Sequence, residues 1–257
     1  MDASKNKITF LGTGTSSGVP ALGCDCPVCR SKDPRDRRMR CSSLVEVGDA
    51  RILVDCGPDF YFQMVNRSFE LFDAVLITHE HYDHVGGLDD LRPYSYRRPQ
   101  QIYCNAITAK HLHERIPYCF RETAVKGLPH LEMNVVEPHK TFYVKDVPVT
   151  PLRVMHGKLE ILGFRIAGLV YITDMKTIPD GEIDYIRGAD LLVVNALRPK
   201  PHPTHQTIAD AISFAQSTGV QHTYFIHMSH DAGFHAEIDS KLPAGMHFAY
   251  DGLEVEF

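Results

Sequence analysis

Three histidines and an aspartate are crowded into the six residues from His79 to His84. In an extended segment alternate side chains share a face, so His79 and His81 point the same way. Asp83 and His84 lie past the turn, where they can reach a second position a few ångströms away. Such crowding is costly in desolvation and repulsion unless a cation offsets it. The segment therefore predicts a metal site with room for two ions.

Other side chains of the same kind follow apolar runs of strand length elsewhere in the chain. Ligands commonly bind at the mouths of strands in α/β sheets, so residues at several strand ends can form one shared site. Histidine is also abundant, with 15 among 257 residues. The runs 74–78, 147–154, 170–173 and 223–226 lead into His79, His156, Asp174 and His227.

A separate cluster of thiols, Cys24, Cys26 and Cys29, has the Cys-X-Cys-X-X-Cys spacing that suits tetrahedral zinc. Such a site needs one more nitrogen or sulfur ligand. His230 is the candidate, because His227 and His230 are an odd number of residues apart on a segment expected to be extended and so face different ways. A structural zinc, worth on the order of 10 kcal/mol, would hold this loop to the C-terminal strand. The alternative is a redox or simply buried thiol cluster.

Sheets must position these side chains, since short β-branched apolar runs recur along the chain. Helical periodicity is clearest after Thr204, where apolar residues from Ile208 to Ala215 repeat at helical intervals and Gly219 supplies a stop. No internal repeat or linker marks a boundary, so residues 1–257 are expected to form one α/β domain. The expected strands are residues 7–11, 43–47, 51–54, 74–78, 147–154, 170–173, 191–194 and 223–226.

The composition excludes several classes of protein. With 44% apolar and 23% charged residues the chain is neither fibrous nor disordered. No apolar stretch approaches the roughly 20 residues of a membrane span, and the net charge of −5 gives no general attraction to nucleic acid or anionic lipid. The start of the chain lacks the layout of a signal peptide. We therefore expect a cytoplasmic protein whose seven cysteines are reduced, buried or bound to metal.

The stretch from Thr78 to Gly87 resembles the HxHxDH signature of the metallo-β-lactamase superfamily. The resemblance implies an αββα sandwich, in which two sheets pack face to face with helices outside, and here the single domain would include a structural zinc loop near residues 24–29. It also implies two metal ions at the catalytic site. By position, the first ion would be held by His79, His81 and His156, the second by Asp83, His84 and His227, and Asp174 would bridge them.

Further stretches resemble one subfamily, the PhnP-type phosphodiesterases. They are the cysteine cluster, the segment from Asn195 to His205 and the ending Ala249 to Leu253, so the likeness covers nearly the whole chain. The resemblance implies metal-dependent hydrolysis of a phosphodiester, with a small cyclic ribose phosphate or related nucleotide as substrate. It maps the structural zinc ligands of the subfamily onto Cys24, Cys26, Cys29 and His230, and its general acid onto His205.

Two cations roughly 3.5–4 Å apart can hold a hydroxide between them and clamp the oxygens of an in-line displacement. The predicted nitrogen and oxygen ligands accept zinc or manganese at both positions. His205 is expected at the start of the helix after Thr204, where backbone N–H groups favour an anion and an imidazolium can protonate the departing alkoxide. Asp174 and His205 are thus the expected catalytic residues, and Arg198 is a candidate for binding the phosphate.

Two other functions share parts of this pattern. A ribonuclease of the tRNA 3′-end type has the same HxHxDH core, but it normally carries a protruding arm between the bridging aspartate and the general acid, and only 30 residues lie between Asp174 and His205. A non-hydrolytic metalloprotein resembling the accessory protein of pyrroloquinoline quinone biosynthesis has a similar cysteine cluster. The presence of all seven expected catalytic ligands favours hydrolysis over it.

The expected partner is a small-molecule phosphodiester substrate, with no nucleic acid and no membrane. A homodimer is expected only by analogy with related enzymes. The basic run from Arg30 to Arg40 has two interpretations, because it could contact a polyanionic substrate or form an ordinary solvated face.

Overall fold

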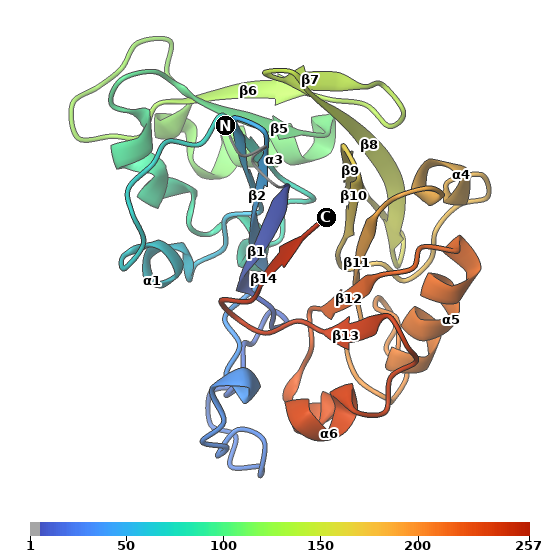
Figure 1. The fold of residues 1–257 in the computed structure, drawn as a ribbon. Helices are drawn as coiled ribbons and strands as arrows, with labels where there is room; N and C mark the ends of the chain where they lie inside the picture. Colours follow the sequence, from blue (N-terminus) through green and yellow to red (C-terminus); the bar gives the residue numbers. More distant parts are fainter. Residues whose placement is uncertain (1–5) are drawn as a thin grey trace.

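Two seven-stranded β-sheets face each other at the centre of the computed structural model, which describes residues 6–257 (Figure 1). The first sheet has the strand order β14-β1-β2-β3-β4-β5-β6. Strands β3 to β6 run parallel, whereas β14, β1 and β2 are antiparallel to their neighbours. Its strands are β1 Lys7–Gly12, β2 Ser42–Val47, β3 Ala50–Val54, β4 Ala74–Leu76, β5 Gln100–Cys104, β6 Leu131–Val135 and β14 Glu254–Glu256.

The second sheet has the order β13-β12-β11-β10-β9-β8-β7. Strands β10 to β13 run parallel, and β7, β8 and β9 join them as an antiparallel meander. In both sheets the parallel strands therefore end at one common edge. The strands are β7 Phe142–Val144, β8 Val147–His156, β9 Leu159–Ile166, β10 Leu169–Ile172, β11 Leu191–Asn195, β12 Thr223–Ile226 and β13 Met246–Phe248.

Each sheet is apolar on both faces, and the alternation of side chains along its strands produces this. In β3, Ile52 and Val54 pack between the sheets while Leu53 faces outward. In β10, Tyr171 packs between the sheets while Val170 faces outward. All five are fully buried, and burial of a large apolar side chain contributes about 1.5–3 kcal/mol. The molecule therefore has three apolar layers, one between the sheets and one beneath the helices on each side.

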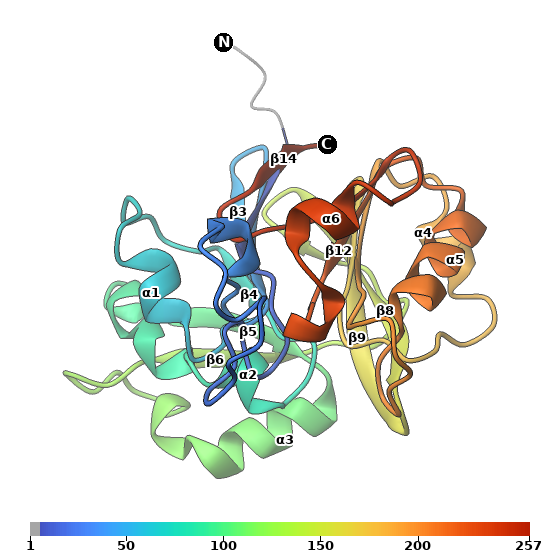
Figure 2. The same cartoon turned by 90° about the horizontal axis from the view of Figure 1, so that it is seen from below.

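Helices cover the two outer faces of the sandwich, with α1 and α3 on one side and α4 and α5 on the other (Figure 2). Ala109 and Leu112 of α3 pack on the first sheet, and Ala211 and Ala215 of α5 pack on the second. The α-helices are α1 Phe60–Met64, α2 Tyr82–Val85, α3 Ala106–Arg115, α4 Ile183–Ile186, α5 Ile208–Thr218 and α6 His235–Asp239, and the 3₁₀ turns are Pro34–Asp36, Leu88–Ser95, Pro117–Cys119 and His230–Ala232.

The expected αββα sandwich is confirmed, and each of the eight expected strands has a counterpart. Six strands were not expected from the sequence. Three of them, β7, β13 and β14, have only three residues each, and β6 lies at a sheet edge with exposed positions, so their apolar signal is weak. No helix in the part of the chain from residue 6 onward is long and apolar enough to cross a membrane.

The helix expected directly after Thr204 begins later than the sequence suggested. Thr207 is its N-cap, its side chain accepting from the backbone of Asp210 while the Asp210 side chain accepts from the backbone of Thr207. Gly219 ends the helix with φ 76°, as expected. His205 therefore lies in the turn before the helix, and the expectation that it lies at the start of this helix is wrong.

The reciprocal cap gives a test of how α5 is anchored. Thr207→Ala removes the hydroxyl acceptor and should lower the free energy of unfolding by about 1 kcal/mol. Thr207→Ser keeps the acceptor and should stay close to wild type. Urea denaturation of the three proteins measures the difference, and equal stability of the alanine and serine variants would contradict this account of the cap.

Candidate metal centre

Three acidic or histidine residues that closely follow parallel strands have a left-handed backbone conformation, which residues other than glycine rarely adopt. They are Asp55 just after β3 with φ 58°, Asp174 shortly after β10 with φ 54°, and His227 just after β12 with φ 59°. Holding such a residue there costs roughly 1–3 kcal/mol. These bends occur where parallel strands of both sheets end, and all three side chains meet in one cluster.

The first group of donors comprises His79, His81 and His156, as expected. Nε2 of His79 lies 3.0 Å from Nδ1 of His81, and the rings of His81 and His156 pack edge to face with centroids 5.2 Å apart. Nδ1 of His156 donates to the backbone carbonyl of Asp174 at 2.8 Å, so its Nε2 keeps a lone pair for a ligand. His79 is buried and His81 is exposed. Solvent therefore reaches this group from the side of His81.

The second group comprises Asp83, His84 and His227. Helix α2 begins after His81, and Asp83 and His84 lie within its first turn, not past it as the sequence suggested. Oδ2 of Asp83 lies 3.2 Å from Nε2 of His84 and 3.7 Å from Nε2 of His227. Both rings are buried.

Asp174 lies between the two groups. Its Oδ2 is 3.2 Å from Nε2 of His84, and its Oδ1 is 3.2 Å from Nε2 of His227. The potential ligand atoms of His79, His84 and Asp174 all lie within 4.8 Å of one another. One carboxylate can therefore contribute to both groups, in the bridging position expected from the sequence.

The electrostatics of the cluster favour added positive charge. His84 is faced by three carboxylates, those of Asp174, Asp83 and Asp55. Burial disfavours its charged form, but the carboxylates outweigh burial and raise the pKa of His84 well above its usual value. Conversely, burial opposes ionisation of Asp174, but His227 and His84 hold its pKa well below the usual range. The three carboxylates around His84 therefore favour a positive charge at this position.

The residues present fit a pair of divalent cations. Nε2 of His84 and Nε2 of His227 are buried without a hydrogen-bond partner among the described residues, although both face carboxylates. Burying a ring nitrogen without a hydrogen-bond partner is costly, and a cation that replaces its proton and takes the lone pair would remove this cost. Imidazole with carboxylate is a donor set that zinc and manganese accept. Metal binding by these seven residues remains a prediction.

Asp55 belongs to this site, and the sequence analysis missed it. Its Oδ2 accepts from Nδ1 of His84 at 2.7 Å, and its Oδ1 accepts from the backbone N–H of Thr78 at 2.8 Å. The first contact fixes the proton of His84 on Nδ1 and leaves Nε2 to face the cluster. Asp55 directly follows the expected strand 51–54, just as the other acids and histidines follow theirs, and this signal could have identified it.

Helix α3 supports the same motif from outside. The carboxylate of Glu80 accepts from Oγ1 of Thr108 at 3.2 Å and lies 3.1 Å from Nδ1 of His111. Arg115 donates to the backbone carbonyl of Glu80 at 2.7 Å. Helix α3 thus holds Glu80 in place. Because Glu80 lies between His79 and His81, this fixes the spacing of the two imidazoles.

His205 contacts the cluster around Asp174, and Arg198 lies in the same loop. Nε2 of His205 is 2.9 Å from Oδ1 of Asp174, and the ring is buried against that of His227 with centroids 4.9 Å apart. Burial lowers the pKa of His205 to about 4. Arg198 is half-buried, and its guanidinium lies 3.3 Å from a carboxylate oxygen of Asp231 and bonds backbone carbonyls of its own loop. Its role in phosphate binding remains a prediction.

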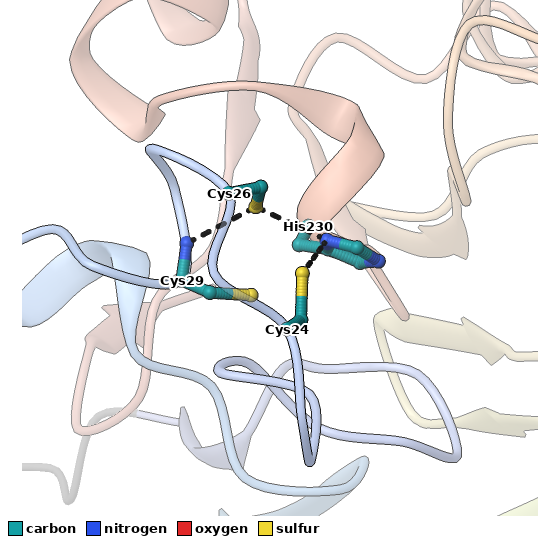
Figure 3. Close-up of side chains that lie close together, drawn as sticks. All are labelled: Cys24, Cys26, Cys29 and His230. Carbon is teal, nitrogen blue, oxygen red and sulfur yellow. Dashed lines mark hydrogen bonds between the residues drawn. The ribbon is translucent and has the colours of Figure 1, made fainter.

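The four residues expected to hold a structural zinc are also brought together (Figure 3). Nδ1 of His230 lies 3.3 Å from Sγ of Cys24 and 3.2 Å from Sγ of Cys26, and all four ligand atoms, that of Cys29 included, lie within 4.8 Å. A tetrahedral zinc separates its ligand atoms by about 3.5–3.8 Å, so the cluster needs little adjustment. The hydrogen bond to His230 lowers the pKa of the Cys26 thiol to about 6, which favours the thiolate that binds metal.

The reasoning that led to His230 was wrong in one respect. Residues 227–230 are not extended, because His227 has a left-handed backbone and His230 begins a 3₁₀ turn. The two imidazoles still serve different clusters, His227 beside Asp174 and His230 beside the cysteines.

Internal contacts take up much of the basic run from Arg30 to Arg40. Arg38 is buried and donates to Oγ1 of Thr13 at 2.8 Å and to the carbonyl of Ala249 at 2.7 Å. Arg37 is exposed. The run therefore braces the loop that carries the cysteines. Its remaining ion pairs are Arg30 with Asp25, Arg35 with Asp33 and Arg40 with Asp59.

Asp55→Asn tests how the second group of donors is oriented. The new amide would donate to Nδ1 of His84, and the histidine proton would move to Nε2, the atom that faces the cluster. We expect metal affinity to fall about 10–100-fold, measured by titrating metal-free protein with zinc or manganese. The exposed Asp184→Asn is the control. Unchanged affinity in the Asp55 variant would show that this hydrogen bond does not set the tautomer.

Cys26→Ala tests the cysteine cluster. It should lower bound zinc by one ion per chain and lower the midpoint of thermal unfolding, because the loop loses its link to His230. Metal analysis and calorimetry measure both effects. Cys119→Ala, which removes a buried thiol outside any cluster of potential ligands, should leave zinc content unchanged. Retention of wild-type zinc by the Cys26 variant would exclude a structural zinc here.

Comparison with known proteins agrees with this architecture. Residues 50–228 match the model of the beta-lactamase superfamily domain. A Porphyromonas gingivalis protein named octanoyltransferase is 46% identical over 248 residues, which cover 95% of this chain. The match spans only 50% of that relative, so the chain corresponds to about half of its length.

Similar solved structures indicate which family within the superfamily the chain resembles. A diphosphatase from the PhnP family superposes with a TM-score of 0.92 at 40% identity, over 98% of this chain and 97% of the other. Zinc-bound PqqB from Methylobacterium extorquens superposes with a TM-score of 0.79 over 98% and 100% of the chains, and at 19% identity it shows the fold alone. The chain thus belongs to the beta-lactamase superfamily and, within it, to the PhnP family.

Proposed function

We propose that this protein is a metal-dependent phosphodiesterase that cleaves a small cyclic ribose phosphate or a related nucleotide. The observation that carries the proposal is the position of Asp174. Its carboxylate lies 3.2 Å from His84 and from His227 of the second group, and within 4.8 Å of the potential ligand atoms of His79 and His156 of the first. The same carboxylate lies 2.9 Å from the buried ring of His205. A paired metal site with a proton donor at its edge matches the needs of phosphoryl transfer to water.

The PhnP-family relative supports this proposal only as far as hydrolysis of a P–O bond, since the bond between two phosphates that a diphosphatase cleaves is not a phosphodiester. It is described as a diphosphatase, so hydrolysis of a phosphate linkage is known for a protein that shares 40% of its residues with this chain. The word octanoyltransferase describes a relative about twice as long, and acyl transfer is therefore not the activity proposed here.

Cations held by the two groups of donors would act as Lewis acids toward the phosphoryl oxygens and the attacking water. The chain itself supplies orientation and a proton. His205 has its Nε2 directed into the cluster, where it can protonate the oxygen that leaves phosphorus. His79, His84 and Asp174 are buried, which limits water around the reacting atoms, whereas the exposed His81 marks the open side.

A tRNA-processing ribonuclease is disfavoured by the segment between Asp174 and His205. Its 30 residues form α4, β11 and short connections, so the protruding arm expected of such an enzyme does not occur in this segment. The PqqB-like alternative shares the fold, but the complete set of donors around Asp174 and the placement of His205 favour hydrolysis.

Asp174→Ala should reduce hydrolysis of bis(4-nitrophenyl) phosphate to background, because both groups of donors lose their common carboxylate. The assay uses protein loaded with zinc or manganese, and 4-nitrophenyl phosphate alongside tests the preference for diesters. Asp184→Ala, an exposed acid on α4, should keep wild-type turnover. If the wild-type protein with both metals bound cleaves no diester, the proposed function is wrong.

A further inference from the structure

Lys176 is a cation beside the cluster around Asp174, and the proposed function does not use it. It lies two residues after Asp174, in the segment that follows β10. Its side chain is half-buried, and its ammonium group donates to the backbone carbonyl of His205 at 3.2 Å. A carbonyl holds an ammonium group in place without neutralising its charge. Within residues 6–257 no carboxylate forms an ion pair with Lys176, so no direct partner cancels this charge.

The segment that carries Lys176 runs beside the turn that carries His205. Oδ1 of Asp174 lies 2.9 Å from Nε2 of His205, and the backbone N–H of Gln206 donates to the carbonyl of Met175 at 3.0 Å. The side chain of Met175 is fully buried in the apolar layer beneath α4 and α5. The side chains on either side of it, those of Asp174 and Lys176, both reach His205 instead. Lys176 therefore extends on the side of the cluster and not into the core.

The backbone of Lys176 is anchored to a second part of the same cluster. Its N–H donates to the carbonyl of Met155 at 2.8 Å, and Met155 directly precedes His156. Nδ1 of His156 in turn lies 3.0 Å from the carbonyl of Thr204. The base of the lysine is thus fixed by residues that also place a member of the first group of donors, and only its four-carbon chain is free to move.

Lys176 differs in this respect from Arg198, the cation that the sequence suggested for phosphate binding. Each of the three guanidinium nitrogens of Arg198 is engaged, one by the carboxylate of Asp231 and two by backbone carbonyls of its own loop. An ammonium group has three N–H donors, and the carbonyl of His205 takes one from Lys176. Lys176 thus keeps donors and charge that Arg198 has already committed within the protein.

The acid on which the charge of Lys176 acts is Asp210, and it is already occupied. Hydrogen bonds from Thr207 lower the pKa of Asp210, and the charge of Lys176 contributes to the same shift. The Asp210 carboxylate accepts from the backbone of Thr207 at 3.1 Å in the cap of α5 and forms no ion pair with the lysine. An anion brought to the cluster would therefore not have to displace a carboxylate from Lys176.

We propose that Lys176 binds a non-bridging oxygen of the substrate phosphate and stabilises the negative charge that this oxygen gains during hydrolysis. This inference rests on the proposed phosphodiesterase activity. A phosphodiester carries one negative charge, and attack by hydroxide adds a second that spreads over the phosphoryl oxygens. A cation already held beside that position stabilises the added charge more than bulk water does. The lysine forms no covalent bond and loses no proton in this step.

The test removes the charge of Lys176 and keeps its hydrogen bond. In Lys176→Gln the side-chain amide can still donate to the carbonyl of His205, but it is neutral. We expect kcat/KM for bis(4-nitrophenyl) phosphate to fall about 10–100-fold. Lys176→Arg keeps a cation and should stay within about 5-fold of wild type. Lys241→Gln, at an exposed lysine near α6, is the control and should match wild type. All proteins are compared at equal metal content.

A lysine that only braces the turn would behave differently. Lys176→Ala loses both the charge and the hydrogen bond to the carbonyl of His205. If bracing were the whole role, the alanine variant would be impaired while the glutamine variant kept the wild-type kcat/KM. That result would overturn the inference, whereas equal impairment of the alanine and glutamine variants supports it. Calorimetry of each variant checks that the fold is retained.

Binding of inorganic phosphate separates this inference from the proposed function, because it needs no turnover. We expect the Kd for phosphate, measured by titration calorimetry on metal-loaded protein, to rise about 3–10-fold in Lys176→Gln and to stay unchanged in Lys241→Gln. If the wild-type protein cleaves no diester, the proposed function fails, and a weaker phosphate affinity in the glutamine variant still identifies Lys176 as a phosphate-binding residue. Equal phosphate affinity in the two proteins would overturn the inference even when diesters are cleaved.

Discussion

A carboxylate that is 2% exposed and faced by imidazole nitrogens of His84, His205 and His227 within 3.2 Å is costly to bury. Asp174 has this position, and its backbone is also held at φ 54°. Residues next to Asp174 in the sequence offset neither the burial of its carboxylate nor its strained backbone. The imidazoles that stabilise the carboxylate come from the ends of other strands. Both sheets must therefore be complete before the carboxylate has its partners. The site therefore depends on the whole sandwich, although each segment that contributes to it is only a few residues long.

The same constraint explains why the supporting residues matter as much as the donors. Asp55 fixes the tautomer of His84, and α3 fixes the backbone around Glu80. These contacts restrict the tautomer and the orientation of the imidazoles, so that their nitrogens converge before any cation is bound. Pre-organisation of this kind lowers the cost of binding, since the ligands need not be gathered from solvent.

Much of this arrangement could be predicted from the sequence, because it depends on local pattern. Strands that are apolar on both faces stand out from their loops, and the metal-type residues after the runs 74–78, 147–154, 170–173 and 223–226 are visible in the sequence. The start of α5 was misjudged because apolar spacing does not show which of Thr204 and Thr207 provides the cap. The sequence did not predict that Nδ1 of His202 lies 3.0 Å from Nδ1 of His205, because the turn between them is held by His156 and Lys176, which are distant in sequence.

The two clusters are also mechanically linked. His227 faces the catalytic cluster and His230 faces the cysteines, with only two residues between them. Thr15 donates to the carbonyl of Met228 at 3.0 Å, and Met228 donates to that of Thr13 at 3.1 Å, so the glycine-rich stretch before the cysteines pairs with this short segment. A side chain at Gly14 would meet the carbonyl of Arg38 at 2.8 Å, which explains the glycine. The stretch thus holds the backbone beside His227, so order in the loop that carries the cysteines is passed directly to one of the proposed metal ligands.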